Sequence, residues 1–495
     1  MTKLNGWKMS CSLFLICLAA AATAPAQTFN TLVQFTYANG ADPFAGLVQG
    51  RDGNLYGTTA YGGTCALTNL GCGTVFKMSP AGALQTLHYF TGPDGAFPFS
   101  ELVLATDGNF YGTTVGGGAN CASSNGCGTV FRITPSGSLT TLYSFCSQSN
   151  CVDGQQPYGG LIQATNGNLY GTTNYGGTSA NCDLGCGTFF RITPAGALTT
   201  LSSFTGVPAA FFPATTLVQG ANGKLYGTTQ VGGAHCGGAG CGAVFSVTLA
   251  GKLETIYSFC AQPNCADGDL PTAGLIQATD GNFYGTASSG GNSTGCEGGC
   301  GTVFKITPNG ALTTLHTFSG SDGFDPAAAL FQATDGNFYG TTVEGGYSYQ
   351  CPGGCGTIFQ MTSTGTLTTV YAFPAFSGGS DLRAQLLQHT SGTFFGTTYV
   401  GGFDGAGTAF SLNTGLGPFV TFVRAAGQVG QTGGILGHGF TGATAVAINQ
   451  VPANFKVVSD TYLTATVPSG ATTGYVTVTT PSGVLKSNVP FRILP

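Results

Sequence analysis

Short runs of alternating apolar and polar residues, separated by glycine and proline turns, fill most of the chain. One stretch contains four of them: Glu101-Leu-Val-Leu, Phe110-Tyr-Gly-Thr-Thr, Gly128-Thr-Val-Phe-Arg-Ile-Thr and Leu139-Thr-Thr-Leu-Tyr-Ser-Phe. Alternation in runs of this length predicts β-strands, and the intervening Asp107-Gly-Asn and Pro-Ser-Gly segments predict tight turns. Beyond residue 26 no useful apolar pattern has a helical period, so few helices are expected.

One phrase recurs seven times, at intervals of 55 to 59 residues. A tandem period in this range is typical of repeat architectures, in which one copy cannot bury its own apolar face. The seven copies are Tyr56-Gly-Thr-Thr, Tyr111-Gly-Thr-Thr, Tyr170-Gly-Thr-Thr, Tyr226-Gly-Thr-Thr, Tyr284-Gly-Thr-Ala, Tyr339-Gly-Thr-Thr and Phe395-Gly-Thr-Thr.

Each copy therefore predicts a four-stranded antiparallel unit, whose strands we call a, b, c and d in chain order. Seven such units in a ring predict a seven-bladed β-propeller over residues 27–416, in an all-β protein. The seventh copy, Leu386 to Leu412, lacks a clear strand d, while the run Phe29 to Phe35 precedes any strand a. This run is expected to pair with strand c near Thr408 to Leu412 and so to remove the open edges. An open solenoid is the structural alternative.

Residues 417–495 have a different pattern, in which β-branched runs alternate with Gly and Pro turns and predict a small β-sandwich. The phrases Gly437-His-Gly-Phe, Val467-Pro-Ser-Gly and Thr473-Gly-Tyr-Val-Thr-Val resemble the IPT/TIG immunoglobulin-like domain. Asn449-Gln450 stands where that family often has Asn-Gly. The resemblance implies an Ig-like fold used as a spacer or binding module.

The repeat phrases themselves, with Gly-Cys-Gly-Thr-Val-Phe and Gly-Asn-Leu/Phe-Tyr-Gly-Thr-Thr, resemble those of bacterial secreted GloVer-repeat proteins. That resemblance implies an exported surface or extracellular protein with no established enzymatic activity. The N-terminus agrees with export: Lys3 and Lys8 precede an apolar run, and Ala24-Pro-Ala fits a signal-peptide cleavage site. Residues 1–26 are therefore expected to be a signal peptide. No later apolar run is long enough for a transmembrane helix.

The mature chain would keep sixteen of the eighteen cysteines, all in close pairs. Local pairing, an even count and an export signal predict eight disulfides in an oxidising compartment, whether extracellular, at the cell surface or in the periplasm. Zinc ligation is the alternative, disfavoured because the pairs are expected to lie in separate repeats and the export signal favours oxidation. The pairs are Cys65/Cys72, Cys121/Cys127, Cys146/Cys151, Cys182/Cys186, Cys236/Cys241, Cys260/Cys265, Cys296/Cys300 and Cys351/Cys355.

Strand order sorts the loops into two faces. The a–b and c–d connections are short turns, whereas the b–c and d–a loops are longer and carry every mature cysteine. A binding site is expected on this second face, where residue identity varies. The d–a loops share the phrase Asn/Asp-Gly-x-x-Pro, which places an acid near the expected channel mouth at four positions: Asp94, Asp153, Asp267 and Asp322.

These four acids are the candidate ligand-binding residues, because carboxylate oxygens bind calcium or sugar hydroxyls. The alternative is that they only build the turn, as Asn39 does in the first copy. Calcium is the one possible cofactor. Among the five histidines, His88 and His316 stand at strand-d positions that favour packing, and only His235 lies in a long b–c loop.

No catalytic residue is identified, since the chain contains no nucleophile elbow, zinc-protease helix, phosphate-binding loop or calcium-binding loop motif. The formal net charge of −5 and the lack of a basic run argue against a nucleic-acid partner. The sequence thus predicts an exported, non-catalytic binding or cell-surface interaction protein with a glycan or protein ligand. Two alternatives remain open: a propeller-type glycan-acting hydrolase or lyase, and a structural envelope component.

Overall fold

The protein is described here by a computed structural model that covers residues 27–65, 67–120, 126–206, 210–237, 240–293, 295–346, 350–351 and 353–495. Within these ranges it is all-β, apart from three single-turn 3-10 helices: η1 (Ser149–Cys151), η2 (Pro263–Cys265) and η3 (Phe376–Gly378). The expected signal peptide lies outside the described residues.

The repeats form seven four-stranded antiparallel sheets, one for each copy of the repeated phrase. In chain order they contain β2 (Val48–Gln49), β3 (Leu55–Thr59), β4 (Thr74–Met78) and β5 (Leu84–Tyr89); β6 (Val103–Leu104), β7 (Phe110–Thr114), β8 (Thr129–Ile133) and β9 (Leu139–Ser144); β10 (Ile162–Gln163), β11 (Leu169–Thr173), β12 (Thr188–Ile192) and β13 (Leu198–Ser203); β15 (Val218–Gln219), β16 (Leu225–Thr229), β18 (Ala243–Val247) and β19 (Leu253–Ser258); β20 (Ile276–Gln277), β21 (Phe283–Ala287), β22 (Thr302–Ile306) and β23 (Leu312–Thr317); β24 (Phe331–Gln332), β25 (Phe338–Thr342), β26 (Thr357–Met361) and β27 (Leu367–Ala372); and β28 (Leu387–Gln388), β29 (Phe394–Thr398), β30 (Thr408–Asn413) and β1 (Thr28–Gln34). A two-stranded sheet of β14 (Ala210–Phe211) and β17 (Val231–Gly232) is added in the fourth repeat.

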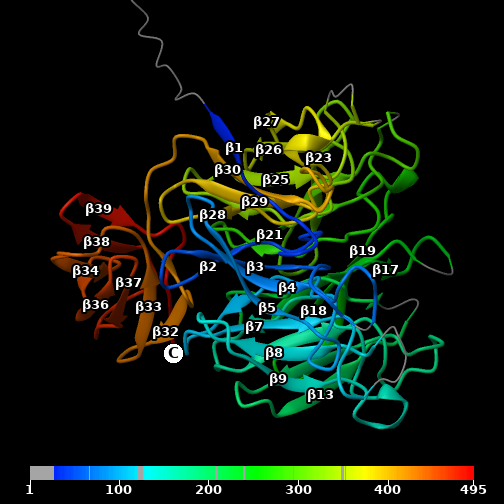
Figure 1. Ribbon diagram of the computed structural model, residues 1–495, viewed down its shortest axis with the longest axis horizontal. Coiled ribbons are helices and arrows are strands. Elements are labelled where there is room, and N and C mark those ends of the chain that lie inside the picture. The colour runs from blue at the N-terminus through cyan, green and yellow to red at the C-terminus, as the bar shows by residue number, and fades with distance from the viewer. Residues whose placement is uncertain are drawn as a thin grey trace, which may run out of the picture.

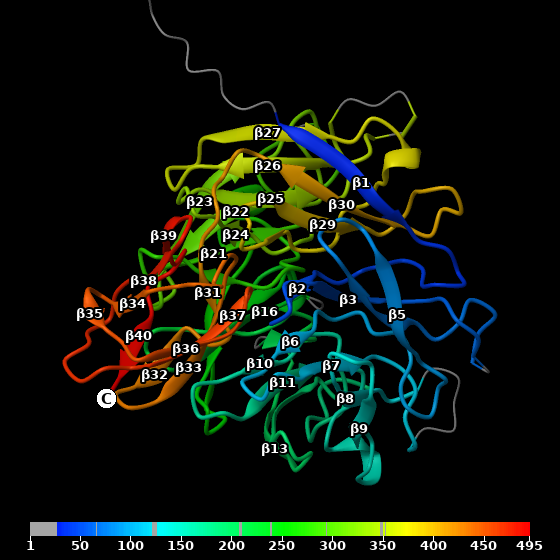
Figure 2. The same ribbon diagram turned by 60° about the vertical axis from the view of Figure 1, so that its left-hand side comes forward.

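The N-terminal strand completes the seventh sheet. β1 pairs antiparallel with β30, from Thr28 opposite Asn413 to Gln34 opposite Thr408. Both views show the dark-blue β1 alongside the orange β30 (Figures 1 and 2). The predicted pairing of the first run with the last strand c is confirmed, and it joins the two ends of the repeat region.

The glycine of the repeated phrase is required by close packing inside each sheet. A Cβ on Gly112 would lie 2.5 Å from Cζ of Phe131, and one on Gly171 would lie 2.7 Å from Cζ of Phe190. Both glycines lie in strand b, in β7 and β11, opposite these strand-c phenylalanines. The prediction that the glycines occupy strands at points of close approach is confirmed.

Neighbouring repeats are joined at their a–b turns by a recurring hydrogen bond. The Oε1 atom of a strand-a glutamine accepts from a backbone N–H in the preceding repeat, at 2.9 to 3.1 Å, in six places: Gln163 to Thr106, Gln219 to Thr165, Gln277 to Ala221, Gln332 to Thr279, Gln388 to Thr334 and Gln49 to Thr390. The second repeat has Leu104 instead, and there Nη2 of Arg51 donates to the Thr106 carbonyl at 2.7 Å. The contacts therefore pass through all seven repeats and return to the first.

The C-terminal segment forms two four-stranded antiparallel sheets that share one apolar core, which includes Leu463 and Val476. The first contains β31 (Thr421–Phe422), β33 (Thr432–Leu436), β37 (Tyr462–Thr466) and β36 (Phe455–Ser459), and the second β35 (Val451–Pro452), β34 (Ala445–Ile448), β38 (Val476–Thr480) and β39 (Gly483–Lys486). β32 (Ala426–Gln428) and β40 (Arg492–Leu494) pair in parallel.

This segment, orange to red in Figure 1, lies against the a–b turns of the repeats. Thr461 Oγ1 donates to the Arg51 carbonyl at 2.7 Å, and Nη1 of Arg492 donates to the Gly220 carbonyl at 2.9 Å. The Arg51 guanidinium also stacks over Tyr462, 4.7 Å from the ring centroid. The short-turn face of the repeats is thus partly covered, whereas the face with the long loops is opposite.

Candidate functional site

The seven repeats surround a cavity of about 650 Å³. Every repeat contributes residues to its lining, mainly from the end of the d–a loop and the start of strand a. A concave site of this size, made by several elements, is typical of a small-molecule binding pocket. The cavity is therefore the candidate site.

One position of the repeat, immediately before the buried leucine that precedes strand a, reaches the cavity in every copy. It is occupied by Gly46, Glu101, Gly160, Thr216, Gly274, Ala329 and Gln385. Six of these residues are small or uncharged, and only Glu101 is ionisable. Gly46 accommodates it, because a Cβ at that position would lie 3.3 Å from Oε2 of Glu101.

Glu101 is half-buried at the border of the cavity. Burial raises its pKa to about 7, and no hydrogen bond or charge among the described residues offsets this desolvation. Glu101 also lines a second cavity of about 260 Å³, which is bordered by Phe419, Phe422 and Leu436 of the C-terminal segment. This acid thus stands between the main cavity and a smaller one beneath it.

Aromatic rings form one wall of the main cavity. Phe44, Phe99 and Tyr158, from the first three repeats, line it in succession. Phe99 packs edge-on against Phe44, with ring centroids 5.3 Å apart, and stacks with Tyr158 at 5.8 Å. The three half-buried rings give the cavity an apolar arc beside the single acid.

The residue four places before the position of Glu101 has a left-handed backbone in all seven repeats. These residues are Asp42, Phe97, Gln156, Phe212, Leu270, Asp325 and Asp381, with φ between 52° and 59°. Non-glycine residues seldom adopt this conformation unless their surroundings impose it. In the second repeat, Phe97 N–H donates to the Cys72 carbonyl at 2.8 Å, and the Phe97 carbonyl accepts from Val115 N–H at 3.0 Å. The same backbone therefore carries four different residue types in the seven repeats, and two of these residues, Leu270 and Asp325, line the cavity.

Three of these side chains are acids from adjacent repeats, and two of them, Asp325 and Asp381, interact with Arg383. Nε of Arg383 lies 2.7 Å from Oδ1 of Asp381, and its guanidinium lies over the rings of Phe44 and Tyr399. Burial and the Asp381 carboxylate raise the pKa of Asp42 to about 6, and burial also raises the pKa of Asp325. This group of side chains therefore contains three acids and a single cation, Arg383.

The four predicted ligand-binding acids do not line the cavity. Asp153 is fully buried and accepts hydrogen bonds from Tyr143 Oη, Ser147 N, Ser147 Oγ and Gln148 N, at 2.8 to 3.3 Å. Asp267 is equally buried and accepts from Tyr257 Oη, Ala261 N and Gln262 N. Their geometry favours the alternative in which these residues form the turn, while their role in binding stays a prediction.

Asp94 and Asp322 are held in the same way by histidines. Nε2 of His88 lies 2.8 Å from Asp94 Oδ2, and Nε2 of His316 lies 2.9 Å from Asp322 Oδ2. Burial alone would raise the pKa of Asp322, but the bonds from His316 and Ser319 outweigh it and lower the pKa to about 2. The two histidines also pack edge-on against Phe90 and Phe318.

Seven of the eight expected cysteine pairs are disulfides: Cys65–Cys72, Cys146–Cys151, Cys182–Cys186, Cys236–Cys241, Cys260–Cys265, Cys296–Cys300 and Cys351–Cys355. Cys121, the expected partner of Cys127, lies outside the described residues. Disulfides in this number indicate an oxidising compartment outside the cytoplasm.

The expectation that the pairs lie apart is wrong in two places. The sulfurs of Cys236, Cys241, Cys260 and Cys265 all lie within 4.8 Å of one another, as do those of Cys127, Cys146 and Cys151. In both cases the b–c and d–a loops of one repeat are adjacent, which their separation in sequence conceals.

Glu101 and the aromatic wall were not identified from the sequence. A usable signal was present, because aligning the seven copies shows a single charge at the position before the strand-a leucine. The left-handed residues could be noticed similarly, since six of the seven directly precede proline. What the sequence could not show is that these positions converge on one cavity.

Comparisons with known proteins agree with the repeat organisation. A sequence-family model described as the Gloeobacter/Verrucomicrobia repeat matches residues 21–239, 120–296 and 292–443. No curated protein matches the chain. None of the helices in the described ranges is long and apolar enough to cross a membrane.

Solved structures resemble the chain only distantly. A protein provisionally named a gluconolactonase aligns with a TM-score of 0.39 and 11% identity, covering 80% of this chain and 94% of its own. A luciferin-regenerating enzyme aligns at 0.40 and 9%, covering 80% and 98%. A Bacteroides thetaiotaomicron protein of unknown function aligns at 0.41 and 13%, covering 78% and 76%.

Proposed function

We propose that this chain, which belongs to the Gloeobacter/Verrucomicrobia repeat family, is an exported binding protein that holds a saccharide in its central cavity. The observation that carries the proposal is the juxtaposition of an aromatic wall, Phe44, Phe99 and Tyr158, with the carboxyl group of Glu101, which has no hydrogen bond or ion pair with the described residues. In this account the seven sheets are the blades of a closed propeller. Residues 417–495 are an IPT/TIG-type Ig-like domain.

Closure of the propeller is supported by the contacts between the first and last repeats. Gln49 and Thr390 form two hydrogen bonds, at 2.9 and 3.0 Å, and β1 pairs with β30 along its length. A closed ring has no open sheet edge and so avoids strand pairing with other chains. It also gives the cavity a fixed outline, because each wall is anchored to two neighbours.

The cavity lining matches the two-sided chemistry of a sugar ring. Aromatic faces carry a negative quadrupole and attract the weakly positive C–H groups on one face of a pyranose. Hydroxyl groups on its edge would donate to the Glu101 carboxylate, with Thr216 and Gln385 as further polar partners from the same ring of positions. A cavity of about 650 Å³ suits a small saccharide better than a folded protein surface.

The C-terminal domain leaves only one face of the repeats through which a ligand would enter the cavity. It contacts the a–b turns through Thr461 and Arg492, and it borders the smaller cavity below Glu101. The ligand would therefore enter from the face with the d–a loops. Leu270 and Asp325, the two left-handed residues that line the cavity, would contact the ligand there.

A glycan array tests the proposal. The wild-type protein is expected to bind a limited set of saccharides, and Phe99→Ala is expected to lose that binding. Phe403→Ala is the matched control, because Phe403 is 97% exposed in a b–c loop and absent from the cavity lining. No binding by the wild type, or equal binding by all three proteins, would contradict a saccharide site in the cavity.

Glycan hydrolysis or lysis is the second candidate, and the raised pKa of Glu101 favours it. A carboxyl group with a pKa of about 7 can give or take a proton at neutral pH, as a general acid or base must. Incubation with each array-positive saccharide, followed by chromatography, separates the two functions. Products that vanish in Glu101→Gln would identify an enzyme, whereas an unchanged saccharide would leave binding alone.

A further inference from the structure

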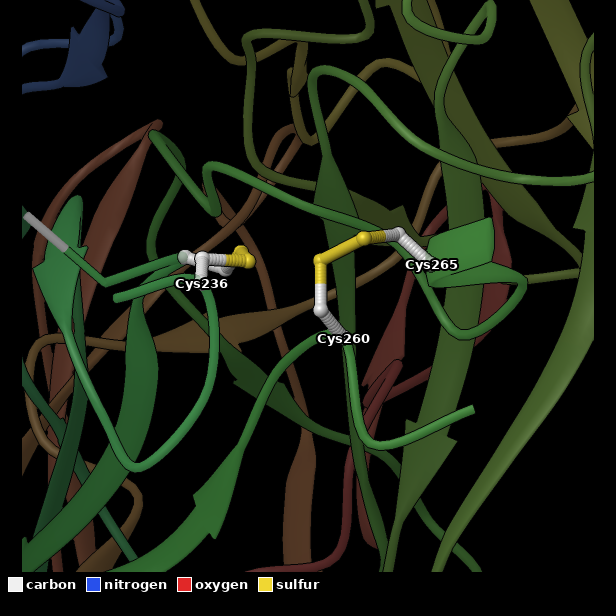
Figure 3. A group of neighbouring side chains, drawn as sticks. Cys236, Cys260 and Cys265 are labelled. Atoms are coloured by element: carbon white, nitrogen blue, oxygen red, sulfur yellow. A yellow bond between two sulfur atoms is a disulfide. The ribbon is translucent and has the colours of Figure 1, made fainter. Parts of the chain in front are cut away.

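Four cysteines of the fourth repeat form a tetracysteine cluster, which we define as Cys236, Cys241, Cys260 and Cys265. The first two form the disulfide of the b–c loop, and the other two form that of the d–a loop. All four sulfurs lie within 4.8 Å of one another, and Figure 3 shows the two disulfides facing each other across the loops. Two disulfides this close can exchange partners with each other, whereas an isolated disulfide has no such neighbour.

The cluster is open on one side. Cys236 is exposed, Cys241 is only 2% exposed, and the remaining two are half-buried. Cys236 is therefore the cysteine of the cluster that an external thiolate would meet first, whereas Cys241 is buried. Access and the choice of sulfur largely decide where disulfide exchange begins.

The backbone of the cluster is also unusual. Cys236, Cys260 and Cys265 have left-handed φ angles of 64°, 58° and 51°. Among the described residues, none of the cysteines in the four isolated pairs, Cys65–Cys72, Cys182–Cys186, Cys296–Cys300 and Cys351–Cys355, has such an angle. Non-glycine residues in this region persist only when their surroundings hold them, and such residues gather at functional sites.

We propose that the tetracysteine cluster is a thiol–disulfide exchange site, which accepts a small external thiol at Cys236 and resolves it with its own second disulfide. In the first step the external thiolate attacks Cys236 Sγ, the Cys236–Cys241 bond breaks, and Cys241 leaves as a thiolate. A buried thiolate is unfavourable in apolar surroundings. The second disulfide lies within reach of it.

In the second step the Cys241 thiolate attacks Cys260 Sγ, which forms a Cys241–Cys260 bond and releases Cys265 as a thiolate. Cys265 then attacks Cys236 Sγ and expels the external thiolate. No electrons are gained or lost, and the two local bridges become two bridges between the loops. If the Cys241 thiolate attacks Cys265 instead of Cys260, the products are the Cys241–Cys265 and Cys236–Cys260 bonds, again with no electrons gained or lost.

The exchange would tie the b–c loop to the d–a loop, which runs on to Leu270 in the cavity lining. Thiol exposure would thus alter one wall of the main cavity. This proposal does not depend on what the cavity binds.

Peptide mapping of the native protein tests it. The protein is treated with limiting glutathione, quenched with acid, alkylated with N-ethylmaleimide and digested at low pH without reduction. The expected products are a glutathione adduct on Cys236 and bridged peptides that join the Cys236/Cys241 and Cys260/Cys265 segments. Only local pairs at every dose, or an adduct that appears no faster at Cys236 than at Cys296, would overturn the proposal.

Two variants with the same chemical change separate exchange from a general reactivity of the loops. The pair Cys260→Ser and Cys265→Ser should abolish the bridged peptides and leave the adduct on Cys236 unresolved. The matched pair Cys296→Ser and Cys300→Ser, which removes an isolated bridge, should leave the bridged peptides unchanged. The wild-type map decides the question even if either variant folds poorly.

Discussion

Thr397 in the seventh repeat donates a hydrogen bond from Oγ1 to the carbonyl oxygen of Ala45 in the first, at 3.3 Å. The equivalent threonine, the first of the repeated phrase, also donates to a carbonyl of the next repeat in every other copy. The acceptor has the same position in five copies, Thr58 to Ser100, Thr113 to Gly159, Thr228 to Ala273, Thr286 to Ala328 and Thr341 to Ala384, whereas Thr172 donates to Pro213, two residues earlier. The junction between the first and last repeats therefore has the same hydrogen bond as five of the six internal junctions.

Removal of the Thr397 hydroxyl tests this equivalence. Thr397→Val should lower the free energy of unfolding by about 1 kcal/mol, because a buried hydrogen bond of this kind is lost. Thr286→Val, at an internal junction with the equivalent acceptor, is the control and should cost a similar amount. The measurement is urea denaturation of both variants. A loss confined to Thr286→Val would mean that the first and last repeats are not joined in solution.

The glycine of the repeated phrase should not tolerate a methyl group. Gly112→Ala places a Cβ 2.5 Å from Cζ of Phe131 and 2.9 Å from Cδ2 of Leu102, so overpacking should cost about 1 to 3 kcal/mol. Gly433→Ala, in β33, has no heavy atom within 4 Å of its new Cβ and should cost little. Thermal melts of the two variants compare them, and equal melting temperatures would refute the packing role.

Asp153 should be structural. Its carboxylate accepts four hydrogen bonds in a fully buried turn, whereas Asn39 in the first repeat accepts one, from Thr36 N. Asp153→Asn replaces an acceptor oxygen by an NH₂ group facing donors, and should cost about 1 to 3 kcal/mol in stability. Asp183→Asn, an exposed change of the same chemistry, should be neutral in urea denaturation. Unchanged stability in Asp153→Asn would return this acid to the list of candidate ligands.

Glu101 should make the protein less stable as the pH rises. Its pKa is raised from 4.5 to about 7 in the folded state, so the folded protein holds this proton more tightly than the unfolded chain. The resulting stability is complete below pH 4.5 and is lost between pH 4.5 and 7, by at most about 3 kcal/mol. Glu101→Gln should lose less stability over this range in urea denaturation. Parallel pH profiles for the two proteins would show that Glu101 is not desolvated.

Much of the fold could be predicted, because the same strand pattern recurs seven times along the chain. The phrase Tyr-Gly-Thr-Thr predicts strand b in each copy. The β-prone run at Phe29, which precedes any strand a, predicted the strand that completes the seventh sheet. The Ig-like assignment of the C-terminal segment stays a prediction beyond its two facing sheets. Sequence could not show that this segment covers the a–b turns, because single residues such as Arg492 and Thr461 make those contacts.

The candidate site was harder to predict for a physical reason. The recurring acids of the d–a loops stood out in the sequence: Asp94, Asp153, Asp267 and Asp322. They recur because each one forms the turn of its loop, in which the carboxylate accepts hydrogen bonds from a strand-d side chain and from the loop backbone. Glu101 occurs once and lies in a short strand-start segment between apolar residues. A binding residue that differs from its counterparts in the other repeats is seen only when the copies are aligned and the cavity is known.

Hydrogen–deuterium exchange with a pool of soluble oligosaccharides tests the central claim most directly. If the cavity binds a saccharide, peptides that contain residues 42–47, 97–102 and 156–161 should become protected together, and Glu101→Gln should weaken that protection. Peptides from the C-terminal sheets serve as an internal reference and should not change. Protection elsewhere, or none in the three cavity segments, would contradict the account.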